Sequence, residues 1–188
     1  MLCLVSCQED PKIRILEQEK EARKQELIFN NINKGWNFNA QLTNETARSL
    51  TGSWAEWRLF VNELGQKPKS SIGAFKQKAK TLSKKAADLN NNIPSKFALP
   101  EVKSRIAAIN TKINAITLFI SLQQIPDDKI VKLVQEINTE VASLQFQLDE
   151  ITRKSNIRIE DGESDMLRML DTTRAIPTTP DPNLKPRQ

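Results

Sequence analysis

The sequence predicts an all-α protein, folded as an up-and-down antiparallel helical bundle with coiled-coil-like heptad packing. Two features of its composition support this class: glycine accounts for only 5 of the 188 residues, and tyrosine is absent. Such usage disfavours sheets that are closed by tight glycine turns. The third observation is periodicity, because three long segments carry apolar residues at alternating spacings of three and four. That repeat is typical of helices that supercoil around one another.

The first predicted helix is a charged spacer. Pro11 suits a first helical turn, and residues 12–25 (KIRILEQEKEARKQ) combine strong helix formers with charges of both signs. Apolar residues are too sparse in this segment to form a packed face, so we expect it to be solvated. Apolar density begins at Leu27, and Gly35 is the expected helix stop.

Four further helices are expected to form the bundle, over residues 40–64, 72–90, 100–120 and 126–153. Asn39 or Thr43 is the candidate cap of the first of these helices, and Ser71 is the candidate cap of the second. Pro100 and Pro126 open the last two helices. The link between those two helices is short, which makes them antiparallel neighbours.

Heptad positions predict which side chains of residues 40–64 enter the core: Thr43, Ala47, Leu50, Trp54, Trp57, Val61 and Leu64. Trp54 and Trp57 are therefore expected to be core residues. The alternative is a binding hot spot, because tryptophan is enriched in such sites. Trp36 follows the Gly35 turn, where it either plugs the end of the bundle or marks a contact site.

The helical pattern fades after Arg153. Ser164 is a candidate cap for a short helix that holds the apolar residues of the segment 166–170. Residues 176–186 contain four prolines, which is typical of an extended, disordered tail.

The first seven residues contain a motif for lipid attachment, Leu4-Val5-Ser6-Cys7, followed directly by the polar residues 8–10. It resembles the lipobox of bacterial lipoproteins, and the acidic pair after the cysteine is similar to the export signals of Bacteroidota surface lipoproteins. The resemblance implies a residual signal peptide at residues 1–6 and acyl chains such as palmitate on Cys7. More than one such chain holds a domain stably on a bilayer. The alternative is a cytosolic protein with an apolar N-terminal stub.

The charge distribution points to a basic face. Residues 66–105 hold ten Lys or Arg and two acids, whereas residues 127–150 hold six acids and two lysines. Lys76, Lys80 and Lys84 recur every four residues and should share one helix face, which would suit an acidic partner or anionic lipid headgroups. Nucleic acid is disfavoured, because interleaved aromatics and base-reading arginines are missing. The alternative is a solvated face that complements the acidic last helix.

Several catalytic chemistries are excluded by composition. The sequence holds no histidine, and its two cysteines both lie in the first seven residues. Histidine-dependent catalysis, histidine metal sites and a four-cysteine zinc site are thereby removed. No phosphate-binding glycine loop or nucleophile elbow is found. We expect no enzyme activity, no cofactor, no metal and no small-molecule substrate.

The expected organisation is a residual signal peptide at 1–6, a lipid-anchored charged spacer at 7–26, the helical bundle at 27–154, and a short helix with the proline-rich tail at 155–188. We expect a lipid-anchored accessory or adaptor protein of the bacterial outer membrane, on either its periplasmic or its surface-exposed side. It would bind partner proteins of an envelope complex. The candidate contact residues are Lys76, Lys80, Lys84, Trp36, Trp54 and Trp57. The alternative is a soluble polyanion-binding protein that uses the lysine-rich helix.

Overall fold

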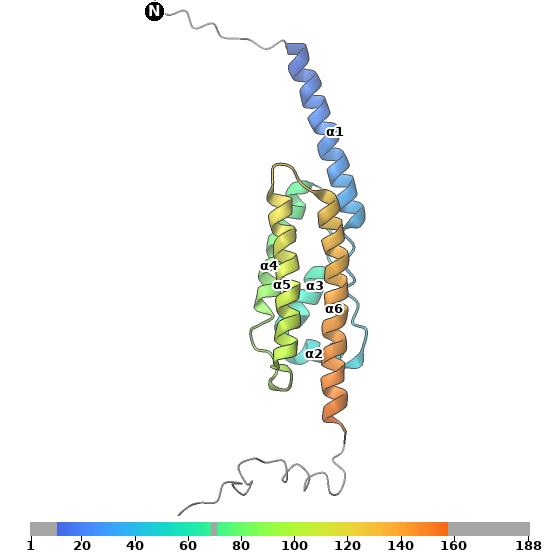
Figure 1. Ribbon diagram of the computed structural model, residues 1–188, viewed down its shortest axis with the longest axis vertical. Helices are drawn as coiled ribbons and strands as arrows, with labels where there is room; N and C mark the ends of the chain where they lie inside the picture. Colours follow the sequence, from blue (N-terminus) through green and yellow to red (C-terminus); the bar gives the residue numbers. More distant parts are fainter. Residues whose placement is uncertain (1–10, 69–70, 158–188) are drawn as a thin grey trace, which may run out of the picture. The chain divides into compact units, whose positions relative to one another are not determined.

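The computed structural model describes residues 11–68 and 71–157. These residues form the helices α1 (Pro11–Gly35), α2 (Glu45–Ser53), α3 (Ala55–Leu64), α4 (Ile72–Asp88), α5 (Pro100–Ser121) and α6 (Asp127–Ser155), with a single 3-10 turn at Ser95–Phe97. The predicted all-α class is confirmed for this part of the chain (Figure 1). The lipobox, the short helix at 166–170 and the proline-rich tail lie outside the described residues.

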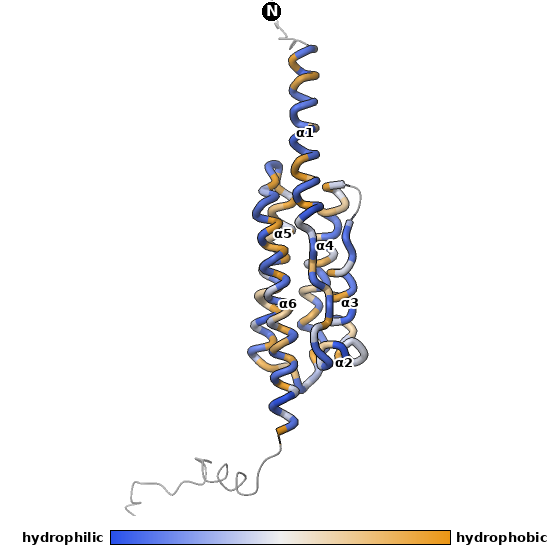
Figure 2. Tube along the Cα trace, turned by 90° about the vertical axis from the view of Figure 1, so that its right-hand side faces the viewer, coloured by the Kyte–Doolittle hydropathy of each residue, from blue (hydrophilic) through white to orange (hydrophobic). Residues whose placement is uncertain are grey.

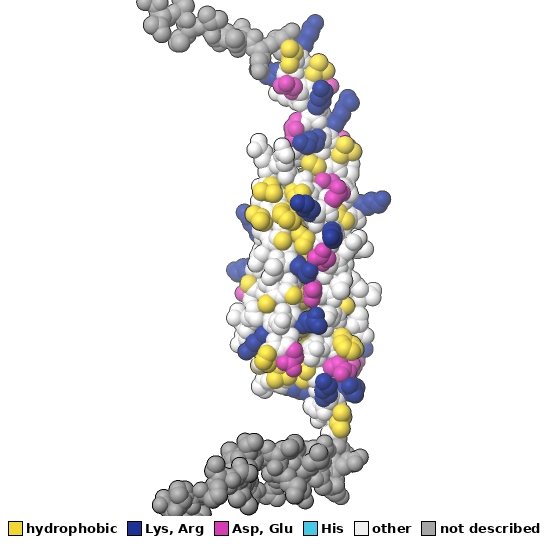
Figure 3. All heavy atoms as spheres, in the orientation of Figure 1, with side chains coloured by type: hydrophobic (Ala, Val, Ile, Leu, Met, Phe, Trp, Pro, Cys, Tyr) yellow, Lys and Arg dark blue, Asp and Glu magenta, His cyan; other side chains and the backbone are white. Residues whose placement is uncertain are grey.

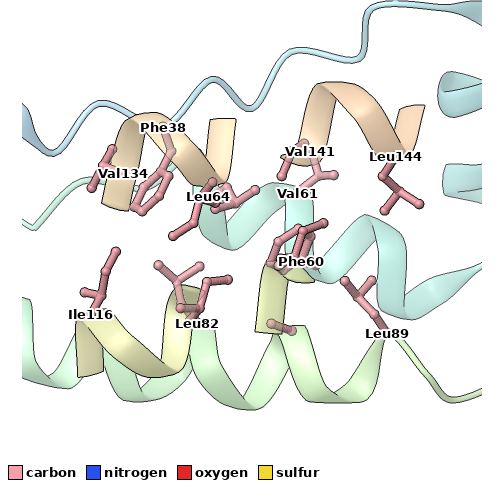
Figure 4. Close-up of a cluster of buried hydrophobic side chains, with 14 of the residues drawn as sticks. Phe38, Phe60, Val61, Leu64, Leu82, Leu89, Ile116, Val134, Val141 and Leu144 are labelled. Carbon is pink, nitrogen blue, oxygen red and sulfur yellow. The ribbon is translucent and has the colours of Figure 1, made fainter. Parts of the chain in front are cut away.

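Helices α3 to α6 alternate in direction and form the predicted up-and-down bundle (Figure 1). Helix α4 packs against both α3 and α5. The Ser83 hydroxyl bonds Asn114 Oδ1 at 2.6 Å, and the Thr117 hydroxyl donates to the Ala79 carbonyl at 3.2 Å, which fixes the register of α4 on α5. Side chains from all four helices meet in one core, which Phe38 joins from outside the helices (Figure 4).

The prediction of one helix over residues 40–64 is wrong, because the structure has two helices there, α2 and α3. The break falls at Trp54, whose backbone is extended, with φ −124° and ψ 91°. Gly52 and Ser53, just before it, are weak helix formers. The heptad positions were nevertheless assigned to the correct side, since six of the seven expected residues are buried.

The seventh position, Thr43, and the predicted caps Asn39 and Thr43 were also wrong. Thr43 is exposed and lies before the helix. The cap is Asn44, whose side chain accepts the N–H of Ala47 at 2.7 Å. The Ser71 cap of α4 is confirmed, because its hydroxyl accepts the N–H of Ala74 at 3.1 Å.

The chain between α1 and α2, residues 36–44, is non-helical and runs beside α6 in the same direction. Asn138 holds its first part. The side-chain N–H of Asn138 donates to the carbonyl of Asn37 at 3.0 Å, and its Oδ1 accepts the backbone N–H of Asn39 at 2.7 Å. One side-chain amide therefore bonds a carbonyl and the N–H two residues further on, as a neighbouring parallel strand would.

Gln145 repeats this pairing one heptad further along α6. Its Nε2 donates to the Gln41 carbonyl at 3.2 Å, and its Oε1 accepts the backbone N–H of Thr43 at 2.7 Å and the Thr43 hydroxyl at 3.0 Å. Asn44 Nδ2 donates to the backbone carbonyl of Gln145 at 2.9 Å. Gln145 is only 2% exposed, so these bonds satisfy polar groups that water does not reach.

Helix α1 is continuous from the solvated spacer into the bundle. Ile28 and Ile32 are its first buried residues, and it ends at Gly35, as predicted. A methyl group at Gly35 would clash with the side chain of Val131 on α6, so glycine permits this close approach. We call residues 12–27, which precede the buried part, the stem; all are exposed apart from half-buried Gln25. Polar and apolar residues alternate irregularly along the stem (Figure 2).

The pairing of residues 36–44 with α6 predicts an unequal cost for two glutamine changes on one helix. Gln145→Ala should lower the free energy of unfolding by about 2–3 kcal/mol, because the N–H of Thr43 and the carbonyl of Gln41 lose their partner. Gln135→Ala, at an exposed position of α6, should change it by about 0.5 kcal/mol or less. Urea denaturation followed by circular dichroism measures both. Equal midpoints for the two variants would contradict the assigned role of Gln145.

Candidate interaction surfaces

The described residues offer surfaces rather than a cluster of reactive groups. Among residues 11–68 and 71–157, no group of three or more His, Cys, Asp or Glu could hold a metal ion. No helix in the same part of the chain is long and apolar enough to cross a membrane. The candidate contact residues from the sequence are tryptophans and lysines of the helical bundle.

Trp54 and Trp57 are completely buried. Their rings stack with centroids 6.0 Å apart. The indole N–H of Trp57 donates to the Ala47 carbonyl at 3.0 Å, and that of Trp54 donates to the Asn91 carbonyl at 3.3 Å. The pair therefore belongs to the core, and neither ring presents a surface to a partner.

Trp36 is also buried, at the junction between α1 and the extended segment. It packs edge-on against Phe38 and Phe75, with centroid distances of 5.3 and 5.0 Å. Its indole N–H meets no acceptor among the described residues. From the sequence, Trp36 could either close the end of the bundle or mark a contact site. The structure has the first arrangement, with Trp36 in the core where α1 ends.

Lys76, Lys80 and Lys84 form a row along α4, which we call the lysine row. Lys80 and Lys84 are exposed and Lys76 is half-buried, and none of the three makes an ion pair within the described part of the chain. Lys78 on the same helix behaves differently, because it is buried and its ammonium contacts Glu63 Oε1 on α3 at 2.6 Å. The lysine row therefore leaves three positive charges for solvent or for a partner.

Two acids of α6, Glu136 and Glu140, are paired with α5 rather than with the lysine row. Lys112 Nζ lies 2.7 Å from Glu136 Oε2 and 3.9 Å from Glu140 Oε1, and Arg105 lies 3.8 Å from Glu140. A mixed column of dark blue and magenta marks this contact on the front face (Figure 3). The expectation that the lysine row complements α6 inside the bundle is thus not met by these carboxylates.

The Lys112–Glu136 hydrogen bond shifts both titrations. The bond from the ammonium lowers the pKa of Glu136 below its ordinary value of 4.5. The same bond raises the pKa of Lys112 above 10.5, against a smaller opposing effect of desolvation. Each charge therefore holds its partner in the ionised form.

A surface that the sequence-based reasoning missed lies on the outside of α5. Its residues, which we call the α5 outer face, are Ala107, Ala108, Thr111, Asn114, Ala115, Leu118 and Leu122. Leu118 is 60% exposed and Leu122 is 43% exposed, and the others are exposed or half-buried. Yellow and white side chains cover this part of the surface, with dark blue along its edge on the α4 side (Figure 3). The available signal was the scarcity of charge, since residues 106–126 contain Lys112 as their single charged residue.

The comparisons with known proteins supply no relative. No protein-family model matches the chain, no curated protein matches it, and no solved structure matches it. Any function assigned to the chain must therefore come from its own residues and surfaces.

The Lys112–Glu136 pair predicts a pH-dependent contribution to stability. The pKa of Glu136 is lowered in the folded state, so the pair stabilises the fold above pH 4.5, and this contribution is lost as the pH falls through the lowered pKa. Glu136→Gln should be less stable than the unchanged chain at about pH 7, and this difference should be smaller at about pH 3. Urea midpoints at both pH values test this.

Glu26→Gln is the matched control, because Glu26 is exposed in the interior of α1 and makes no ion pair among the described residues. Its difference from the unchanged chain should vary little between the two pH values. If both variants show the same pH dependence, the stabilising role of the pair is wrong.

Proposed function

We propose that the protein is a lipid-anchored accessory protein of a bacterial outer membrane, which holds a helical bundle away from the bilayer and binds partner proteins of an envelope complex. The observation that carries this proposal is the stem of α1. It is the N-terminal part of a helix that extends beyond the bundle, and its side chains are exposed rather than packed on the core (Figure 1). A helix in this position would separate the bundle from the membrane, because the sequence has a candidate lipid anchor before its N-terminal end.

The anchor is Cys7 in Leu4-Val5-Ser6-Cys7, four residues before the start of α1. Acylation there would supply the binding energy of the attachment, at about 0.8 kcal/mol for each buried CH₂ group. The stem itself has no apolar face, since nine of its 16 residues are charged. It is therefore suited to the aqueous space beside a membrane rather than to its interior.

The length of the stem would set the distance between the bundle and the bilayer. Its 16 helical residues correspond to about 24 Å at 1.5 Å per residue. Local side-chain bonds such as that from Gln25 Nε2 to Glu21 at 2.9 Å support the helix where no neighbour packs against it. The bundle would then stand off from the bilayer on a stiff connection, which favours contact with other proteins at that height.

A second candidate function is polyanion binding by a soluble form of the chain. The observation in its favour is the lysine row, whose three ammonium groups have no ion-pair partner among the described residues. Binding of this kind weakens steeply with salt. Binding to acidic lipid vesicles or to nucleic acid that disappears in moderate salt, together with no lipid on Cys7, would favour this candidate over the anchored adaptor.

The anchor gives the first functional prediction. Expressed with a complete lipoprotein signal in a bacterial host, the chain should incorporate labelled fatty acid and partition into the detergent phase. Cys7→Ser should abolish both, because it removes the thiol that accepts the acyl chain, whereas Cys3→Ser should change neither. Equal labelling of wild type and Cys7→Ser would contradict the lipid anchor.

The adaptor role gives a second functional prediction. Crosslinking in native membranes should recover the chain together with at least one different protein. Changing Lys76, Lys80 and Lys84 to Glu should weaken that association with helicity unchanged. The charge-matched control is reversal of the exposed residues Lys67, Lys96 and Lys103, which should weaken it less. Recovery of the chain with no second protein, from gently treated membranes, would remove support for the adaptor role.

A further inference from the structure

The stem of α1 is not uniform along its length, because its apolar residues gather at its N-terminal end. We call residues 12–16 the stem tip. It holds Ile13, Ile15 and Leu16, whose exposed fractions are 54%, 53% and 58%. Residues 17–26 hold seven charged residues and Ala22 as their single apolar residue. The far end of the stem thus carries exposed apolar side chains (Figure 3), and charged side chains separate it from the bundle.

The apolar side chains of the stem tip do not continue as a stripe along the helix. Ile13 and Leu16 lie on one face, and the spacing of four and three residues continues that face at Lys20 and Arg23. A partner helix lying along the stem would therefore meet two cations after a single turn. The bundle does not cover these residues either, because the first buried residue of α1 is Ile28. Whatever covers the stem tip must contact the end of the helix rather than its length.

We propose that the stem tip is a second membrane contact, in which Ile13, Ile15 and Leu16 enter the headgroup region of the bilayer with α1 end-on. The partner of the stem tip is the lipid surface that holds Cys7, so the inference rests on the proposed lipid anchor. It adds that the helix begins within the bilayer surface, and that water surrounds the stem only from residue 17 onward.

The length of chain between the anchor and the helix keeps the stem tip at the membrane. Cys7 lies four residues before Pro11, where α1 begins. Four residues span at most about 14 Å even when fully extended. An acylated Cys7 lies at the bilayer surface, so the stem tip cannot move far from that surface. Tethered contacts of this kind act at an effective concentration of about 1 mM or more, so three apolar side chains suffice that would not bind a membrane by themselves.

The length of the stem tip matches the thickness of the headgroup layer. Five helical residues rise about 7.5 Å at 1.5 Å per residue. The headgroup layer on each side of the hydrocarbon core is about 5–7.5 Å thick, and interfacial helices bury apolar side chains about 5–10 Å into this boundary. Glu17, the first acid of α1, follows the stem tip directly. The apolar part of the stem therefore ends where an end-on helix would enter water.

The charged residues of the stem tip, Lys12 and Arg14, are both basic. Their long aliphatic chains can lie along apolar surface while the charged group stays at the level of the lipid phosphates. Glu9 and Asp10 precede them, so residues 9–16 carry no net charge. The contact therefore depends on burial of the apolar side chains, and we expect it to differ little between neutral and anionic bilayers.

Partitioning into phosphatidylcholine vesicles tests the contact. In the full chain with Cys3→Ser, Cys7 is the single thiol, and one myristyl chain is attached to it by alkylation. A single such chain binds membranes only marginally, which leaves the contribution of the stem tip measurable. Changing Ile13, Ile15 and Leu16 to Gln should lower the partition coefficient at least about tenfold. The matched control changes three leucines that are 70%, 44% and 60% exposed to Gln and should leave it unchanged: Leu27, Leu59 and Leu118.

The outcomes separate the stem-tip contact from the anchor on which it rests. Equal partition coefficients for the stem-tip variant and the unchanged chain would overturn the contact and leave the acyl anchor standing. An equal loss in the stem-tip variant and in the control variant would also overturn it, because any exposed apolar side chain would then have the same effect. The myristyl chain is attached chemically, so this measurement does not depend on acylation in a cell. Absence of fatty-acid label on Cys7 in the bacterial host would instead overturn the anchor, and the stem-tip contact with it.

Hydrogen exchange of the same alkylated chain, with and without vesicles, tests the end-on arrangement. The backbone amides of residues 12–16 should exchange more slowly on vesicles, whereas those of residues 17–26 should exchange at the same rate in both samples. Slower exchange along the whole stem would show a helix that lies flat on the bilayer and would overturn the end-on arrangement. Unchanged exchange in residues 12–16 would overturn the contact itself.

Discussion

Two side-chain amides on α6 determine how the chain passes from α1 into the bundle. Residues 36–44 leave the helix, and each peptide hydrogen bond that is lost in this way costs about 0.5–1.5 kcal/mol. Asn138 and Gln145 remove this cost by bonding the segment at two points one heptad apart. Because the segment is held at these points, Phe38 can enter the core beside α6. The path of the chain from α1 to α2 depends on this pairing.

The parts of the fold that could be predicted from sequence are those in which apolar periodicity alone sets the structure. For α4, α5 and α6 the heptad positions, the Ser71 cap and the helix-breaking residues between them all indicate the same helices. The structure has these helices. Residues 36–44 could not be placed in this way, because their partners are polar. Gln145 lies between Leu144 and Phe146, where a glutamine is normally solvated, and the sequence does not show that its amide reaches a backbone 102 residues away. The usable signal was the alternation of Trp36, Phe38, Ala40 and Leu42, which has the period of a strand rather than of a helix.

The candidate surfaces, too, have some features that could be predicted from the sequence and others that could not. The lysine row could be predicted, because a spacing of four residues places side chains on one helix face. Its lack of ion pairs could not, because that depends on which cations the acids of α6 meet. Helix α5 lies between α4 and α6, so Lys112 and Arg105 reach those carboxylates. The tryptophans show the converse, since their type suggested a contact surface and their heptad positions correctly indicated the core.

A comparison of two exposed helices bears on what the molecule does. Nine of the 16 residues of the stem are charged, whereas residues 106–126 hold one charge among 21. Folding alone would tolerate either composition at an exposed position, so the difference reflects what each surface meets. A helix that stays in water without a neighbour needs charged side chains to remain solvated and to support its own turns. A helix face that becomes covered gains from their absence, because a buried, unpaired charge costs more than the contact returns. The stem therefore has the composition of a helix that stays in water, whereas the α5 outer face has the composition of a surface that can be covered.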